Sequence, residues 1–455
     1  MNLAELRQRI QQRSIGLGVV GLGYVGLPLA CVFAEAGFNV VGIDLKPERV
    51  KQINAGVSPI EGHEPGLAEL LAQVVAEGRL RAATTYRDLK DCDVVTINVE
   101  TPVDKAHRPR YTALTAALRS LGPVMKENAL IIVESTLAPG TMASLVKPLL
   151  EETSGKRAGL DFHLGHCPER VMPGKLLTNL RTISRVCGGE TPEVAETMVA
   201  LYRHVVHADL DLSDCVTAEL VKTAENAYRD VNIAFANEVA IVCEAVGGDV
   251  WKVRELVNKS PGRNMLLPGA GVGGHCIPKD PWLLVHEAGA QGVPIRLIPA
   301  ARAVNDAMPL HMVDMLADAL AETGKEIAGA RILVLGYAYL ENSDDTRNSP
   351  SGVLEARLRE LGAEVAVHDP YVAEYQGDVY AMAQGCDAAV VMVGHDVYRQ
   401  MSWETLVANL NNPVLIDGRN VMGAPSVLRS VDVVFRSVGH GSPARPLETR
   451  NSRGN

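Results

Sequence analysis

GLGVVGLGYVG, residues 16–26, contains the pattern G-x-G-x-x-G twice, starting once at Gly16 and once at Gly21. In a dinucleotide-binding fold this loop follows a strand and opens a helix. The residues before Gly16 are polar, whereas Gly21 follows an apolar run and Gly26 leads into an apolar helical pattern, so the second copy fits. Gly21 then makes the turn, Gly23 lets the backbone approach a pyrophosphate, and Gly26 allows close helix packing.

An acidic residue extends this pattern. Asp44 ends the next apolar run, FNVVGID, about 20 residues beyond the loop, where such folds carry the residue that binds ribose. Its carboxylate can accept hydrogen bonds from ribose hydroxyls and would repel a 2′-phosphate. The stretch therefore predicts an NAD site rather than an NADP site; the alternative is a glycine-rich turn that binds nothing.

Short β-rich runs alternate with helical patterns at both ends of the chain. In the first 150 residues the expected strands are SIGLGVV, FNVVGID, CDVVTINV and ALIIVEST. From residue 330 they are ARILVLGYAYL, AEVAVHDP, CDAAVVMVG, PVLIDGRN and VDVVFRSVG. Such alternation is typical of parallel sheets with helical crossovers. It predicts an α/β protein with two Rossmann-like doubly wound domains joined by a central helical segment.

The central segment has its own pattern. A long helix is expected from 213 to 246, capped by Ser213 or Asp214 and ended by Gly247 and Gly248. Further helices are expected after Asp249 and from about 296 to 322. The predicted regions are a Rossmann-like domain at 1–205, the helical segment at 206–322, a second α/β domain at 323–440 and a flexible tail at 441–455.

The composition is that of an ordinary globular protein of two or three domains, with 455 residues, 47% of them apolar and 22% charged. A net charge of −10 without a basic stripe argues against nucleic acid as a partner. The first 14 residues hold no apolar signal core, and no later run has 18 uninterrupted apolar residues. We therefore expect a cytoplasmic protein without membrane association, whose eight cysteines are thiols.

Two polar residues are one turn apart on the long helix. Lys222 and Asn226 stand at i and i+4, so an ammonium and an amide could converge on one ligand oxygen and stabilise an oxyanion. The alternative is a solvated polar face.

GVGGHCIPKD, residues 271–280, places Cys276 among glycines. Glycines admit a ligand close to the backbone, and Lys279 with Asp280 supplies charge that can tune a thiol, so Cys276 is a candidate nucleophile. A buried small residue is the simpler interpretation. A third is a zinc site formed by the dipeptides His166-Cys167 and His275-Cys276, although adjacent side chains point apart.

Six segments, in this order, resemble the nucleotide-sugar 6-dehydrogenase family, the UDP-glucose/GDP-mannose dehydrogenases. They are GLGYVGLP at 21–28, ESTLAPGT at 134–141, CPERVMPGK at 167–175, ELVKTAENAYRDVNIAFANE at 219–238, GVGGHCIPKDP at 271–281 and DDTRNSPS at 344–351. The resemblance implies NAD-dependent oxidation of a sugar C6 alcohol to a carboxylate, with two hydrides removed per turnover. It also implies that the second α/β domain binds the UDP-sugar and that the helical segment carries dimerisation and catalysis.

The resemblance assigns chemical roles to several positions. Cys276 matches the nucleophile, which forms a thiohemiacetal and then a thioester. Lys222 and Asn226 match the groups that stabilise oxyanions. Asp280 matches a residue that works with Lys222 on the catalytic water or on a proton.

Other residues match those that the family uses for thioester hydrolysis and for substrate binding. Glu169 matches the general base for thioester hydrolysis, and Thr136 matches a residue that orders water. Arg263 matches an arginine that reaches the substrate across a subunit boundary, which implies a homodimer, and Arg347 lies near the nucleotide end. Leu340 stands where the family usually has a lysine. Cofactor contacts are expected at Gly21, Gly23, Tyr24, Val25, Gly26, Asp44, Thr101 and Thr136, and substrate contacts at Glu169, Arg170, Lys222, Asn226, Arg263, Gly273 and Arg347.

The sugar is the least defined part of this prediction. CPERVMPGK and GVGGHCIPKDPW are most similar to enzymes acting on UDP-N-acetylmannosamine, then UDP-N-acetylglucosamine, then UDP-glucose. Two other function classes stay open: a hydroxyacid-type dehydrogenase, which removes one hydride and needs no Cys276, and a zinc-stabilised nucleotide-binding scaffold. His275 receives no role, and no metal is expected in the dehydrogenase reading.

Overall fold

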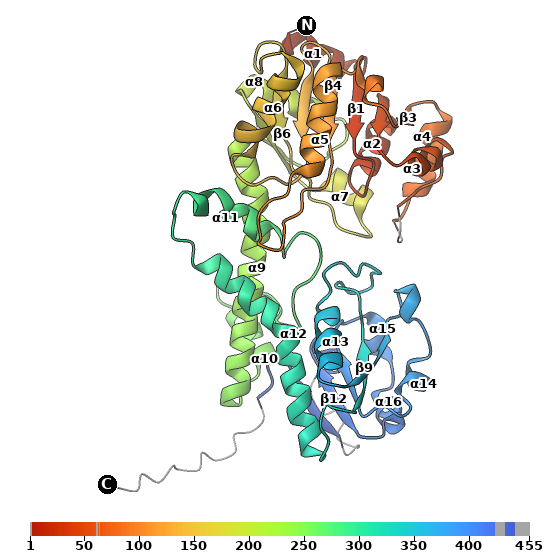
Figure 1. Ribbon diagram of the computed structural model, residues 1–455, viewed down its shortest axis with the longest axis vertical. Coiled ribbons are helices and arrows are strands. Elements are labelled where there is room, and N and C mark those ends of the chain that lie inside the picture. The colour runs from red at the N-terminus through yellow and green to blue at the C-terminus, as the bar shows by residue number, and fades with distance from the viewer. Residues whose placement is uncertain (1, 61, 63, 424–432, 442–455) are drawn as a thin grey trace. The chain divides into compact units, whose positions relative to one another are not determined.

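The computed structural model describes residues 2–60, 62, 64–423 and 433–441, and the chain divides into two units (Figure 1). Unit 1 comprises Met1–Asn226 and Lys279–Ile295, and unit 2 comprises Ala227–Pro278 and Arg296–Asn455. The domain boundaries expected at 205/206 and 322/323 stay predictions. Apart from Gly441, the tail expected at 441–455 lies outside the described residues.

Unit 1 is built around eight strands. They are β1 (Gly16–Val20), β2 (Asn39–Ile43), β3 (Leu80–Ala83), β4 (Val94–Ile97), β5 (Leu130–Val133), β6 (His163–His166), β7 (Arg185–Gly189) and β8 (Leu210–Asp214). They form one sheet in the order β3-β2-β1-β4-β5-β6-β7-β8. The neighbours are parallel except β6 and β7, which are antiparallel. The order of the first six strands is that of a dinucleotide-binding Rossmann fold.

Helices cover both faces of this sheet, because side chains alternate along each strand. Val94 and Leu130 pack with α2 (Gly26–Glu35) on one face. Val95 and Ile131 pack with α5 (Thr112–Leu121) on the other. The remaining helices of unit 1 are α1 (Leu3–Gln11), α3 (Pro47–Asn54), α4 (Leu67–Ala76), α6 (Lys147–Ser154), α7 (Leu176–Thr182), α8 (Pro192–Tyr202) and α11 (Asp280–Ala290).

The longest helix, α9 (Cys215–Val246), contributes to both units. Asp214 precedes it and accepts a hydrogen bond from the Thr217 amide at 2.9 Å, and Gly247 follows with φ +76°. These are the expected cap and the left-handed terminator. The helices expected after Asp249 and over 296–322 are found as α10 (Val250–Val257) and α12 (Leu297–Glu322).

Unit 2 contains a second sheet, made of β9 (Arg331–Leu335), β10 (Glu364–His368), β11 (Ala388–Val391), β12 (Val414–Asp417) and β13 (Val434–Ser437). The strands are all parallel, in the order β10-β9-β11-β12-β13. This is the second common doubly wound order, in which ligands bind beyond the carboxyl ends of the strands where the order reverses. The reversal here lies between β9 and β11.

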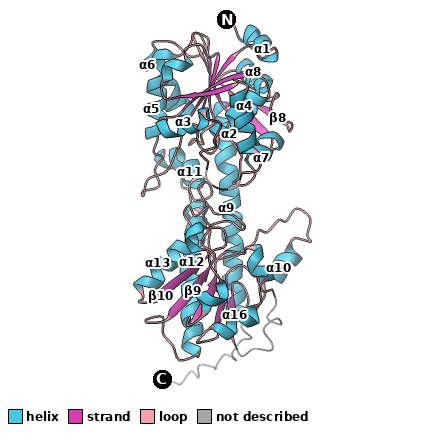
Figure 2. Cartoon of the chain, turned by 90° about the vertical axis from the view of Figure 1, so that its right-hand side faces the viewer, coloured by secondary structure: helices cyan, strands magenta, loops and turns pink. Residues whose placement is uncertain are grey.

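The faces of this sheet are also covered on both sides (Figure 2). Ile332 packs with α12 and α13 (Pro350–Glu360), and Leu333 packs with Tyr398 and Trp403 on the opposite face. The smaller helices are α14 (Val379–Ala383), α15 (Asp396–Gln400) and α16 (Trp403–Asn409). The predicted fold, two doubly wound α/β domains with a helical segment between them in the chain, is confirmed.

None of the helices in the described part of the chain combines the length and apolarity that a membrane span requires.

Candidate active site

The glycine loop has the geometry of a pyrophosphate-binding turn. Gly21 follows β1 with φ +88°, a conformation that favours glycine. A Cβ at Gly26 would lie 1.9 Å from the Gly21 carbonyl oxygen, so α2 can begin this close to the turn only with glycine. A Cβ at Gly23 would meet nothing within 4 Å. The loop therefore fits the diphosphate of a dinucleotide at the start of α2.

Asp44 lies beside this loop at the end of β2. Its carboxylate accepts hydrogen bonds from the Leu22 amide at 3.2 Å and the Lys46 amide at 2.9 Å, and pairs with Arg49 at 3.2 Å. A carboxylate offers about four lone-pair positions, so it keeps acceptor capacity for a ribose hydroxyl. The site fits NAD as the sequence predicts.

Tyr24 and Val25 are the other two residues of the loop at which cofactor contacts are expected. Val25 precedes α2. Tyr24 donates a hydrogen bond to Glu64, which also accepts from the Gly174 amide at 2.7 Å. Glu64 could not be predicted from the sequence, because Tyr24 and Gly174 are 40 and 110 residues away from it in the chain.

A chain of polar contacts links the other expected residues of unit 1. The Thr101 hydroxyl donates to the Thr136 carbonyl oxygen at 2.7 Å, and Lys279 Nζ donates to the Thr101 carbonyl oxygen at 3.2 Å. Lys279 pairs with Asp280 at 3.4 Å, and Asn226 Nδ2 donates to Asp280 Oδ2 at 2.5 Å. The structure therefore brings Thr101, Thr136, Asn226 and Asp280 into one network.

Burial distinguishes the polar residues of α9. Lys222 is only 6% exposed and Asp280 is fully buried, whereas Arg229 is exposed. Lys222 therefore does not belong to a solvated face, which was the alternative interpretation. A buried ammonium one turn from the Asn226 amide is suited to stabilising a negatively charged oxygen.

The CPER segment is tied to α9. Arg170 Nε pairs with Glu225 at 2.9 Å, and its Nη1 donates to the Ser184 carbonyl oxygen at 2.8 Å. Glu169, next to it, is half-buried and accepts from the Val171 amide at 2.7 Å. These contacts fix the backbone that carries the expected general base.

His166 and Cys167, one half of the zinc alternative, are fully buried. Burial lowers the pKa of His166 to about 4, and its Nδ1 is 2.8 Å from the Val133 carbonyl oxygen. Within residues 2–60, 62, 64–423 and 433–441, no group of three or more His, Cys, Asp or Glu side chains could hold a metal ion.

The cysteine loop belongs to unit 2 up to Pro278. Gly274 donates its amide to the Arg347 carbonyl oxygen at 3.0 Å and accepts from Asn348 Nδ2 at 3.0 Å. A Cβ at Gly273 would lie 2.7 Å from the Asn348 carbonyl oxygen. The loop that bears the half-buried Cys276 is therefore packed against the segment that follows β9.

The two arginines expected near substrate also lie in unit 2. The Arg347 side chain pairs with Asp345, with Nε 2.9 Å from Oδ1. Arg263 is exposed, and its Nη1 donates to the Pro261 carbonyl oxygen at 2.9 Å. Leu340, at the position where a lysine is usual, is 40% exposed.

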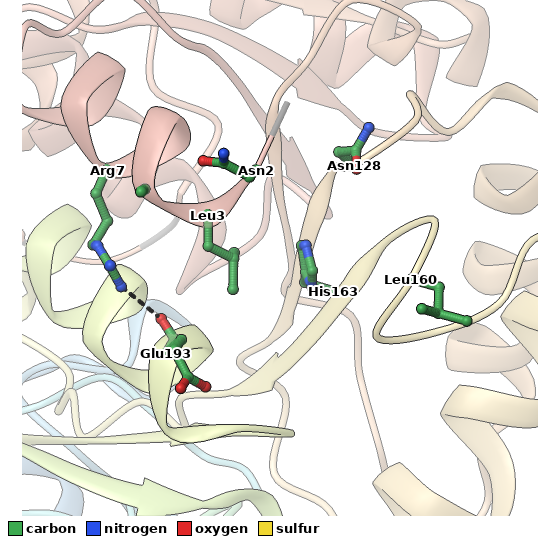
Figure 3. Close-up of a pocket in the computed structure, with 8 residues that line it drawn as sticks. Asn2, Leu3, Arg7, Asn128, Leu160, His163 and Glu193 are labelled. Atoms are coloured by element: carbon green, nitrogen blue, oxygen red, sulfur yellow. Dashed lines mark hydrogen bonds between the residues drawn. The ribbon is translucent and has the colours of Figure 1, made fainter.

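A cavity of about 640 Å³ lies elsewhere in unit 1 (Figure 3). Its wall includes Leu3 and Arg7 from α1, His163 at the start of β6 and Glu193 from α8. The start of β6 is the amino edge of the parallel strands, opposite to the edge where the glycine loop follows β1. None of the expected site residues lines this cavity.

The expected site residues divide between the units. Unit 1 holds those at Gly21, Gly23, Tyr24, Val25, Gly26, Asp44, Thr101, Thr136, Glu169, Arg170, Lys222, Asn226 and Asp280. Unit 2 holds Arg263, Gly273, Cys276 and Arg347. The boundary at Pro278 and Lys279 falls between the candidate nucleophile and Asp280 in the chain.

Comparison with known proteins gives matches over most of the chain. Residues 15–206 match the NAD binding domain of the UDP-glucose/GDP-mannose dehydrogenase family, residues 216–307 its central domain and residues 333–424 its UDP binding domain. The UDP-N-acetyl-D-mannosamine dehydrogenase of Pyrococcus horikoshii is 39% identical over 93% of this chain and 99% of its own length. The enzyme of that name from Escherichia coli K12 is 34% identical over 89% and 98%.

Solved structures agree with these matches. The structure of UDP-D-ManNAc dehydrogenase from Pyrococcus horikoshii superposes with a TM-score of 0.89 at 39% identity, covering 94% of this chain and all of that one. The NDP-N-acetyl-D-galactosaminuronic acid dehydrogenase of Methanosarcina mazei has a TM-score of 0.85 at 36% identity, covering 96% and 98%. The three domain matches, which include the UDP binding domain, favour this family over the hydroxyacid-type alternative. The chain belongs to the UDP-glucose/GDP-mannose dehydrogenase family and is an NAD-dependent oxidoreductase.

Proposed function

We propose that this protein oxidises the C6 hydroxyl of UDP-N-acetyl-D-mannosamine to a carboxylate, using two NAD per sugar. The observation that carries the choice of sugar is that relatives with that named activity are 34–39% identical to this chain over most of its length. The runner-up substrates are UDP-N-acetylglucosamine and then UDP-glucose. Because a thiolate nucleophile needs a reducing compartment, the proposal includes a cytoplasmic location.

The first half of the reaction converts the alcohol to an aldehyde. Bound NAD supplies the two-electron acceptor that takes a hydride from C6, and this happens twice per sugar. The buried Lys222 and the Asn226 amide hold the C6 oxygen while its charge changes. Asp280, held by Asn226 and Lys279, takes part in moving the hydroxyl proton.

The second oxidation starts from a tetrahedral adduct, because loss of hydride directly from the trigonal carbon of an aldehyde would leave an unstable acylium cation. The Cys276 thiolate adds to the aldehyde carbon and gives a thiohemiacetal, whose oxidation gives a thioester. Glu169 then removes a proton from a water molecule that Thr136 orders. Attack by this water releases the uronate and regenerates the thiol.

A panel of UDP-sugars tests this proposal. Purified protein with NAD and UDP-N-acetylmannosamine is expected to form two NADH per sugar consumed, measured by absorbance and by quantifying the uronate product. The same assay with UDP-N-acetylglucosamine, UDP-N-acetylgalactosamine and UDP-glucose should give a kcat/KM lower by about 10-fold or more, because a misplaced hydroxyl leaves buried polar groups unpaired. Only one NADH per sugar, or no NADH from any of the four, would rule the proposal out.

The proposal also includes a homodimer. On α9, Tyr228, Phe235 and Val242 repeat every seven residues and are 65%, 55% and 57% exposed. An exposed apolar stripe of this kind on a helix is suited to packing against a second copy. The exposed Arg263 is then available to reach the partner's substrate.

Phe235→Glu tests the dimer. Light scattering is expected to give twice the chain mass for the wild-type protein and the single-chain mass for the variant, because a charge would be buried in an apolar contact. Loss of turnover should accompany dissociation, since Arg263 would no longer reach the other subunit. Leu160→Glu changes an equally exposed leucine in unit 1 and should change neither mass nor turnover. A Phe235→Glu protein that stays dimeric would exclude this surface.

A further inference from the structure

Glu219 is a carboxylate to which no role has been assigned so far. It lies on α9 three residues before Lys222 and is 1% exposed. Its Oε2 accepts the Gly140 amide at 2.7 Å and its Oε1 accepts the Met142 amide at 2.8 Å. These amides begin the helical stretch that continues into α6. Glu219 therefore caps that helical stretch from another part of the chain.

These bonds close the network described above. The segment from Thr136 to Met142 is held by Thr101 at its beginning and by Glu219 at its end. From Thr101 the contacts run through Lys279 and Asp280 to Asn226, which lies seven residues after Glu219 on α9. A closed circuit of this kind fixes the spacing between the Thr136 segment and the polar residues of α9.

We propose that Glu219 is a positioning residue, which holds the Thr136 segment against α9 so that the catalytic water lies in line with the thioester. This inference rests on the proposed function, because it assigns Glu219 to the hydrolytic half of that reaction. Glu219 itself touches backbone amides, so its effect on the reaction passes through Thr136.

The role requires an ionised carboxylate. Two acceptor oxygens match the amides of Gly140 and Met142, whereas a protonated carboxyl group carries a hydrogen on one oxygen. The pKa of Glu219 is raised to about 7: burial raises it most, the amides of Met142 and Gly140 lower it, and the charge of Asp214 raises it. Cys215 and Tyr111 also face it, and burial keeps both neutral by raising their pKa values. The Glu287 side chain is also nearby, with its Cγ 3.9 Å from the position that a Cβ on Gly140 would take.

The sign of the pH effect follows from this. Glu219 is ionised above about pH 7. The rate of thioester hydrolysis should therefore be highest above that pH and should fall as the pH drops below it.

The experiment compares full-length wild type, Glu219→Gln and Glu152→Gln, a control at an exposed glutamate on α6. NADH release is followed from the first turnover with UDP-N-acetylmannosamine, and the intact mass of the protein is measured during turnover. Glu219→Gln leaves one amide facing an NH₂ group, and kcat should fall by about 10- to 100-fold. The KM values for NAD and sugar should change less than about 3-fold. The NADH burst should persist while an acyl adduct accumulates on Cys276.

Some outcomes would contradict a positioning role for Glu219. A Glu219→Gln protein with wild-type kcat, or one that loses the burst and binds NAD poorly, would overturn a positioning role. If that variant does not fold, Glu219→Asp replaces it; this keeps the charge but shortens the reach, and the same adduct is expected. A wild-type hydrolysis rate that is flat between pH 6 and 8 also contradicts the inference. Failure of the proposed function itself looks different, because the wild-type protein would then make no NADH from any UDP-sugar.

Discussion

Replacing Cys276 by alanine is expected to lower uronate formation by on the order of 10⁴-fold, because loss of a nucleophile removes the covalent path altogether. The first oxidation does not need the thiol, so the variant should still form some NADH and release or retain an aldehyde. Packing should survive, since the side chain is half-buried and alanine is smaller.

Three measurements check this result: NADH per sugar, uronate by chromatography and trapping of the aldehyde with a hydrazine reagent. Cys215→Ala is the matched control, because Cys215 is also half-buried but burial raises its pKa to about 12. It should keep wild-type turnover. A Cys276→Ala protein that forms two NADH and uronate at the wild-type rate would remove the covalent mechanism.

Asp280→Asn should be nearly as damaging, with kcat lower by about 10²- to 10³-fold. The wild-type carboxylate is fully buried between the Asn226 amide and the Lys279 ammonium. With asparagine, the Lys279 charge loses its counter-charge in a buried position, which costs about 3–5 kcal/mol when such a pair is broken. Both turnover and the free energy of unfolding are therefore expected to fall.

A double variant separates the two effects. Lys279→Met with Asp280→Asn removes the unpaired charge, so part of the lost unfolding free energy should return, measured by denaturant titration. Turnover should stay low, because the proton-transfer group is still missing. If Asp280→Asn loses stability but keeps wild-type kcat, Asp280 belongs to the fold alone.

The strands that the sequence predicted are those with apolar, β-branched runs. VVTI in β4 and LIIV in β5 are buried on both faces of the sheet, so they form continuous apolar runs. The sequence did not indicate β3, β6, β7 or β8. Their residues, LRAA, HLGH, RVCGG and LDLSD, include glycine, alanine and polar or charged side chains that disfavour strands. These strands form because the sheet offers edges for pairing beyond β2 and beyond β5, which is a tertiary effect.

Some residues of the candidate site could also be predicted from the sequence, and others could not. Asp44 and the three glycines could be predicted because their spacing along one βαβ unit fixes their arrangement. Lys222 and Asn226 could be paired because helix geometry sets their distance. Glu219 and Glu64 could not, since they accept hydrogen bonds from backbone amides 77 and 110 residues away, and backbone groups leave no mark in a sequence.

Unit 1 consists of two separate stretches of the chain, because Lys279–Ile295 belongs to it together with Met1–Asn226. This limits how such a gene can be recombined. The bond from Asn226 to Asp280 joins two stretches of unit 1 that are separated in the chain by 227–278. A crossover between homologous genes inside that interval would pair an asparagine from one parent with an aspartate from the other. Chimeras meant to exchange the sugar-nucleotide half should therefore keep residues 1–295 from one parent, or exchange 227–278 as a cassette.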